Sequence, residues 1–180
     1  SSEWVSEAKK RGLYNLVSTP ECLPYFTTDR SVELFTKHHI FTKEEIFSRY
    51  EILLENYAKT IGIEARTMIE MLTKDFLPAV SLYSGQTAQN AASKKTLLPG
   101  LSTVSEETLV NKLTDAYTKI SEGTEELKEL TKKAASMEQM QQAADFCQKE
   151  LLTKMQQIRQ IVDETEALLP DSVLPYPTYD

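Results

Sequence analysis

The chain has 180 residues, enough for one domain with a sizeable core or for one domain with extensions. The net charge of −7 argues against a surface that follows nucleic-acid phosphates or an anionic membrane. No apolar run approaches the roughly 18 residues of a membrane span, and no signal peptide is visible. We therefore expect neither nucleic acid nor a membrane as a partner.

The first residues predict short helices separated by proline-containing chain. Residues 1–12 have the pattern of one helix, with Gly12 as the residue that follows its end. Residues 13–27 contain two prolines among apolar side chains. We expect them to form an irregular segment that lies on an apolar surface.

A second short helix is expected to begin at Thr28 or Asp29 and to run to about Lys37. The only histidines, His38 and His39, follow it directly. Adjacent histidines at a helix end favour a surface or helix-dipole role over a metal site, because further ligands at a suitable spacing are lacking.

A long amphipathic helix is predicted to follow. Thr42 and Glu45 have the spacing of a capping box at its start. Pro78 lacks a backbone donor and crowds the preceding turn, so we expect a bend near residues 74–78. The expected apolar stripe recurs at steps of three or four, at positions 46, 50, 53, 57, 61, 65, 68, 72, 76, 79 and 83.

Residues 84–104 leave helix and loop open. A structureless stretch of this length is unusual inside a compact domain, and residues 84–98 also suit a polar helix end. We favour a helix that continues to roughly Thr96 and stops before Pro99.

Two more helices are predicted, the first beginning near Ser105. A second capping box at residues 136–139 would begin the other helix, which Pro170 ends. The short connection predicts an antiparallel hairpin. The expected stripes are Leu109, Leu113, Ala116, Tyr117, Ile120, Thr124, Leu127, Leu130 and Ala134, then Met140, Ala144, Cys147, Leu151, Met155, Ile158, Val162, Thr165 and Leu169.

The predicted fold is therefore all-α. It is a helical bundle in which one long bent helix packs on an antiparallel helical hairpin, with short helices at the N-terminal end. We divide the chain into a connector at 1–41, a bundle at 42–170 and an extended, proline-containing tail at 171–180.

One charge on the long helix is misplaced. Ile61, Ala65 and Leu72 share an apolar face, and Glu64 falls inside that arc. The carboxylate is either a group with a perturbed pKa in a pocket or a buried or half-buried acceptor for tyrosine, arginine or backbone donors of a neighbouring element. The second interpretation is favoured, because Glu64 has no identifiable acid or base partner.

No catalytic, cofactor-binding or metal-binding residue is predicted. The sequence has no nucleophile elbow, phosphate-binding glycine loop or Glu-x-x-His pair. Cys22 and Cys147 have no metal or redox spacing, so free thiols, with Cys147 in the core, are favoured over a Cys22–Cys147 disulfide. Tyr50 and Tyr57 lie on the apolar stripe, which favours core packing over base stacking.

Three segments resemble the C-terminal region of type III glutamine synthetases. They are SRYEILLENYAKTIGIEARTMIEMLTKDFLPAV (48–80), EAKKRGLYNLVSTPECLPYF (7–26) and PYPTYD (175–180). The resemblance is specific over 48–80, moderate at both ends, and rests only on helical pattern over 84–170.

The resemblance implies a fragment of a large cytoplasmic, oligomeric ligase that joins ammonia to glutamate with ATP and Mg²⁺ or Mn²⁺. The ligands for metal and nucleotide lie upstream in that family, so no catalytic residue carries over and the fragment itself needs no cofactor. The implied function is a non-catalytic domain of nitrogen metabolism, with the catalytic domain of the same polypeptide and further copies as partners. The alternative is a free-standing helical adaptor that binds a partner helix in a groove.

Overall fold

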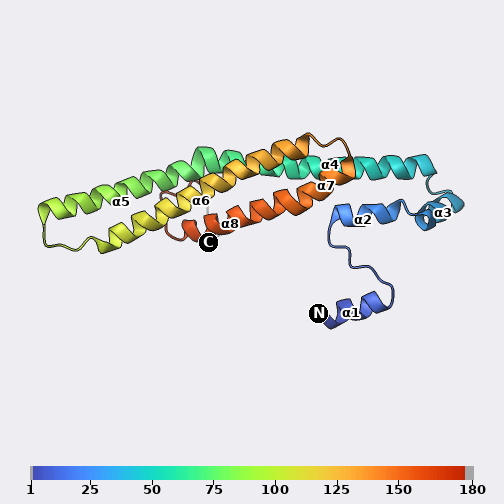
Figure 1. Cartoon of the computed structure of the whole chain (residues 1–180), viewed down its shortest axis with the longest axis horizontal. Helices are drawn as coiled ribbons and strands as arrows, with labels where there is room; N and C mark the ends of the chain where they lie inside the picture. The colour runs from blue at the N-terminus through green and yellow to red at the C-terminus, as the bar shows by residue number, and fades with distance from the viewer. Residues whose placement is uncertain (1, 177–180) are drawn as a thin grey trace. The chain divides into compact units, whose positions relative to one another are not determined.

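The computed structural model describes residues 2–176, in which helices are the only regular elements and no strand occurs (Figure 1). The all-α prediction is confirmed. The helices are α1 (Ser2–Lys10), α2 (Thr19–Phe26), α3 (Asp29–Lys37), α4 (Lys43–Met71), α5 (Leu77–Leu97), α6 (Val104–Ala135), α7 (Met140–Phe146) and α8 (Leu152–Glu166), with π-helical turns η1 (Leu72–Phe76) and η2 (Cys147–Leu151).

The chain divides into two compact units. The first unit consists of Ser1–Gly62 and Ala134–Lys149, and the second unit of Ile63–Lys133 and Glu150–Asp180. Helix α4 contributes residues to both units.

Helix α1 ends as the sequence predicts. Gly12 has a φ of +77°, and the N–H of Leu13 donates to the carbonyl of Ala8 at 2.9 Å. The N–H of Gly12 donates to the carbonyl of Lys9 at 3.1 Å. These two bonds form a Schellman motif, in which glycine tolerates the left-handed conformation that closes the helix.

The prediction of an irregular segment over residues 13–27 is wrong for α2, which is helical from Thr19 to Phe26. Pro20 lies in the first turn, where a backbone N–H has no helical partner to lose. Pro24 lies inside the helix and cannot donate to the carbonyl of Pro20. The side-chain Nε2 of Gln141 donates to that carbonyl at 3.0 Å, so the proline leaves no unsatisfied acceptor.

Two predicted helix starts are confirmed. The hydroxyl of Thr28 accepts from the N–H of Ser31 at the start of α3. At the start of α4, Glu45 accepts from the N–H of Thr42 at 2.7 Å, and the hydroxyl of Thr42 accepts from the N–H of Glu45 at 3.2 Å. Both pairs use side chains to bind donors that the first helical turn leaves open.

The buried face of α4 differs from the predicted stripe at one leucine. Leu53 is 47% exposed, whereas Leu54 is fully buried. The steps from Leu54 to Ile61 and from Ala65 to Leu72 are both seven residues, the repeat of a helix packed at a shallow angle. Periodicity alone could not choose between two adjacent leucines.

Pro78 is accommodated by a change of helix type. Leu72–Phe76 form a π-helical turn, and the N–H of Leu77 donates to the carbonyl of Leu72. The irregularity that the sequence predicts near residues 74–78 therefore begins at residue 72. The helix then continues as α5 to Leu97, which confirms a helix rather than a loop over 84–96.

The prediction of a second capping box at residues 136–139 is wrong. Helix α6 ends at Ala135, and the N-cap of α7 is Gln139, without a side-chain capping bond. A box at residues 136–139 would begin a new helix directly after α6 and leave no residues for the chain to reverse. The structure uses those residues as the connection.

In the second unit, α8 packs antiparallel on α6. Lys154 forms an ion pair with Glu126, while Ile158 lies beside Gly123, so residue numbers rise on one helix as they fall on the other. Ile120, Leu127 and Ile158 are buried, as predicted. Figure 1 shows α6 running alongside α5 over one part of its length and alongside α8 over another.

Helix α8 ends at Glu166, four residues before Pro170. The described part of the tail contains no helix, and its first residues form a turn in which Val173 donates to the carbonyl of Pro170 at 2.9 Å. Residues 177–180 of the predicted extended tail lie outside the described residues.

Candidate functional site

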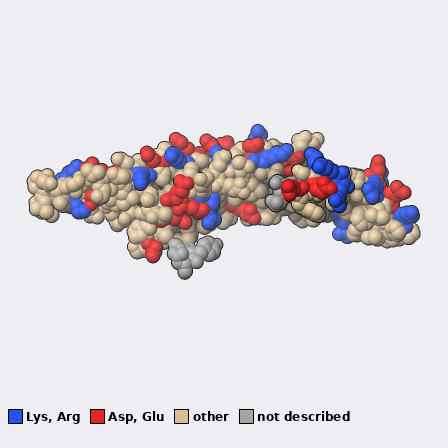
Figure 2. Space-filling view, turned by 90° about the horizontal axis from the view of Figure 1, so that it is seen from below, with Lys and Arg blue, Asp and Glu red and all other residues tan. Residues whose placement is uncertain are grey.

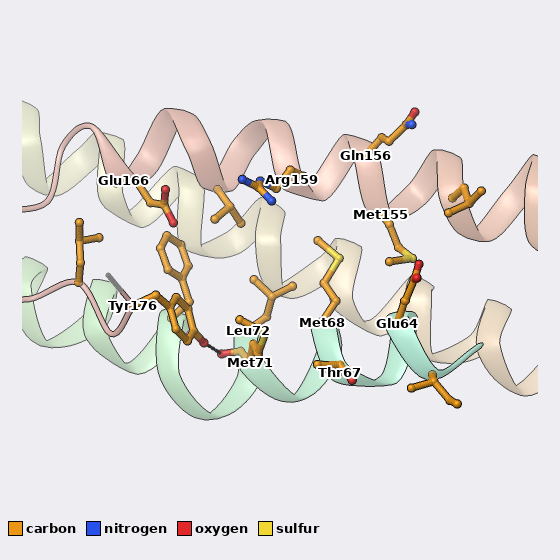
Figure 3. Close-up of a pocket in the computed structure, with 15 residues that line it drawn as sticks. Glu64, Thr67, Met68, Met71, Leu72, Met155, Gln156, Arg159, Glu166 and Tyr176 are labelled. Carbon is orange, nitrogen blue, oxygen red and sulfur yellow. Dashed lines mark hydrogen bonds between the residues drawn. The ribbon is translucent and has the colours of Figure 1, made fainter. Parts of the chain in front are cut away.

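A groove of about 880 Å³ lies in the second unit, between the last two turns of α4, η1 and α8 (Figure 3). Apolar side chains from these elements form most of its wall. The principal ones are Met68, Met71, Leu72, Phe76, Leu152 and Met155. A concave, mostly apolar surface of this size falls within the range of small-molecule sites.

The tail closes one end of the groove. The hydroxyl of Tyr176 lies 3.0 Å from the carbonyl oxygen of Met71 (Figure 3) and 3.1 Å from Oδ2 of Asp75, and it can donate its proton to either. Burial, together with the bond to Asp75, raises the pKa of Tyr176 to about 12. The neutral phenol therefore holds the tail to η1 over the physiological pH range.

Sequence reasoning missed Tyr176. Its only signal was an aromatic residue between two prolines after the last helix, a pattern that indicates extended chain rather than a specific contact. The π-helical turn, which places Met71 and Asp75 within reach of one hydroxyl, could not be read from the sequence.

Glu64 is not the half-buried acceptor that the sequence favours. Its side chain is exposed on the rim of the groove, and among the described residues it has no hydrogen bond or ion pair. The helical arc does contain the buried residues Ile61, Ala65 and Leu72. Glu64 lies at the edge of that arc, where the groove replaces a packed neighbour.

Helix α8 supplies the other charged side chains of the groove. Arg159 points toward the groove, and its Nε donates to Oδ1 of Asp163 at 2.7 Å. Glu166 lies near the tail, half-buried, and its charge helps to raise the pKa of Tyr176. The charged side chains that line the groove are one arginine, Arg159, and two glutamates, Glu64 and Glu166, so the groove has a negative excess.

A second polar cluster lies in the first unit. The hydroxyl of Tyr50 donates to Oε1 of Gln141 at 2.7 Å, and Nε2 of Gln141 reaches both Pro20 and Asp145. Burial, followed by the charges of Asp145 and Glu51, raises the pKa of Tyr50. This cluster ties α2, α4 and α7 together and contains no group arranged for chemistry.

The other residues singled out from the sequence lie apart from the groove. Cys22 is an exposed free thiol, and Cys147 is a buried one whose pKa is raised by burial. His38 is the C-cap of α3, and His39 adopts a positive φ of 55°; both are exposed. Within residues 2–176, no three His, Cys, Asp or Glu side chains gather in a way that could hold a metal ion.

The surface charge is mixed. Figure 2 shows acidic and basic side chains interspersed over the face in view. In the described part of the chain, no helix is both long and apolar enough to cross a membrane.

Comparison with known proteins decides the family. The model of the glutamine synthetase C-terminal domain matches residues 1–95, more than half of the chain. The chain belongs to the glutamine synthetase C-terminal domain family. The match includes α1–α4 and most of α5, and the resemblance seen at residues 7–26 and 48–80 falls within it.

Three similar proteins that align with nearly the whole chain are named glutamine synthetases. It is 44% identical over 179 residues to a glutamine synthetase of Butyrivibrio fibrisolvens, 27% identical to a type-3 glutamine synthetase of Dictyostelium discoideum, and 24% identical to a glutamine synthetase of Bacteroides fragilis. Each alignment covers 99% of this chain but only 25–26% of the relative. The chain thus spans about a quarter of the length of these relatives.

Proposed function

We propose that this chain is the non-catalytic helical domain of a type III glutamine synthetase. Its role is to pack against the catalytic domain of the same polypeptide and to contribute to subunit assembly. The reaction of the parent enzyme, ATP-dependent ligation of ammonia to glutamate with Mg²⁺ or Mn²⁺, takes place outside this chain, in a cytoplasmic oligomer. The family match and the named relatives support this assignment.

The packing role is supported mainly by residues 3–41, which bury almost none of their side chains. Among described residues 3–41, Pro20 alone is buried, and α3 buries none of its side chains. Large apolar side chains are exposed instead: Trp4, Leu13, Tyr14, Val17, Leu34 and Ile40. So many exposed apolar side chains in one short stretch with almost no buried residue support a role in packing against another surface, and this stretch lies within the family match.

Exposed leucines at the turn between α5 and α6 offer a matched comparison. Leu98 is 61% exposed and Val17 is 74% exposed, so neither substitution disturbs a buried core. When the upstream region is supplied as a separate chain, we expect Val17→Asp to weaken its association with this chain, while Leu98→Asp leaves that association intact. Equal effects, or an effect of Leu98→Asp alone, would move the docking surface away from the first 41 residues.

Activity supplies an independent check. The purified chain should show no ATP hydrolysis that depends on glutamate and ammonia, at any Mg²⁺ or Mn²⁺ concentration. Turnover that survives further purification and disappears on a substitution within this chain would overturn the non-catalytic role.

A further inference from the structure

The groove beside Tyr176 has features that packing alone does not explain. It is an apolar hollow on a surface whose neighbouring helices are otherwise well packed, as the buried Leu72, Phe76 and Leu151 show. Three of its wall residues are methionines, Met68, Met71 and Met155. Methionine side chains are flexible and polarizable, so they adapt to ligands of varied shape.

The shape of the groove selects an elongated molecule. One end is closed by the tail, where Tyr176 is bonded to Met71 and Asp75. The other end opens near Ile63, whose side chain is 56% exposed. An alkyl chain lying along the methionines would be covered by α4, η1 and α8 on its sides.

The charge of the groove selects the head group. Within the described part of the chain, the side-chain carboxylates of Glu64 and Glu166 form no ion pair or hydrogen bond, whereas Arg159 is bonded to Asp163. Two carboxylates without a cationic partner therefore border an apolar channel. A ligand with a positive charge at one end would meet a carboxylate whether its head lies at the open end or near the tail.

We propose that this groove binds small cationic amphiphiles, meaning alkyl amines with an apolar chain and an ammonium head. This proposal is independent of the packing role, since the groove lies in the second unit and the exposed apolar surface of residues 3–41 lies in the first. The charge complementarity and the three methionines carry it.

The five methionines of the chain provide the test. With ¹³C-methyl methionine labelling, the methyl signals of Met68, Met71 and Met155 report on the groove. Those of Met137 and Met140, which do not line it, serve as internal controls. The probes are n-octylammonium, n-octanol and octanoate, which share one chain and differ in charge.

We expect octylammonium to shift the three groove signals saturably and to leave the other two unchanged. Octanoate should bind more weakly than octylammonium, by a factor of up to about five. An exposed ion pair contributes at most roughly a factor of five to binding. Glu64→Gln and Glu166→Gln should each reduce the preference for octylammonium by about two- to fivefold. Glu164→Gln, the same change on an exposed part of α8 outside the groove, should not.

Several results would overturn the proposal. Absence of shifts with octylammonium would show that the groove binds no such ligand. Equal binding of all three probes would show an apolar surface without selection for a cation. Groove signals that shift with protein concentration in the absence of a probe would assign the groove to contact between copies of this chain.

Discussion

Glu64 and Ala65 are neighbours on α4 with opposite surroundings. Ala65 is fully buried, while Glu64 is exposed on the rim of the groove. We expect Glu64→Leu to change the free energy of unfolding by about 0.5 kcal/mol or less, as usual for surface substitutions. Ala65→Leu adds three heavy atoms to a packed site and should cost about 1–3 kcal/mol. Urea unfolding of both variants measures the contrast; a loss above about 2 kcal/mol for Glu64→Leu would mean that the carboxylate is structural.

Gln141 bonds three partners at once, Tyr50, Pro20 and Asp145, all in the first unit. Gln141→Leu would leave the carbonyl of Pro20 without the donor that compensates for Pro24 and would leave the Tyr50 hydroxyl without its acceptor. We expect a loss of about 1–3 kcal/mol, the usual cost of stranding part-buried polar groups. The exposed neighbour Gln142 is the control, and Gln142→Leu should stay within about 0.5 kcal/mol. Equal stability of the two variants would contradict this role.

The contact of α6 with α8 depends on a glycine. A Cβ added at Gly123 would lie 3.0 Å from Cγ1 of Ile158, a stiff and buried side chain, whereas at Gly85 in α5 it would meet nothing within 4 Å. Gly85→Ala should stabilise the protein by about 0.5–1 kcal/mol through helix propensity. Gly123→Ala should instead be destabilising by about 1 kcal/mol, since the overpacking exceeds that gain. Thermal unfolding of both variants tests this, and stabilisation by Gly123→Ala would refute the close packing.

The attachment of the tail to η1 predicts a dependence on alkaline pH. The pKa of Tyr176 is raised from 10.0 to about 12 in the folded protein, so the folded state retains the phenol proton that the unfolded state loses. The stabilisation is fully present below pH 10 and is lost as the pH rises through 12. Tyr176→Phe should therefore reduce the fall in stability between these pH values. An absorbance titration of tyrosinate should lose its highest-pH component in the same variant; identical titrations would place the anomalous phenol elsewhere.

Across the whole molecule, features that depend on residues close together in the sequence were predictable, whereas features that depend on contacts between distant residues were not. The capping bonds of Thr42, the glycine after α1 and the stripe of α8 depend on neighbours a few residues away, and they were predictable. Helix α2 was missed because the donor that makes Pro24 tolerable comes from Gln141, more than a hundred residues later in the chain. The groove was missed for the same reason: Met68 and Met155 fit a core stripe, and only the packing shows that they face a hollow.

Light scattering during size exclusion tests the proposed packing of this chain against the catalytic domain of a glutamine synthetase. The chain would be measured alone and with the upstream region of the same polypeptide supplied separately. We expect the chain to bind the catalytic region in a complex of defined mass, and Val17→Asp to weaken that complex. A chain that forms a stable self-associated species and ignores the catalytic region would contradict it, and would make assembly between copies the principal role of these helices.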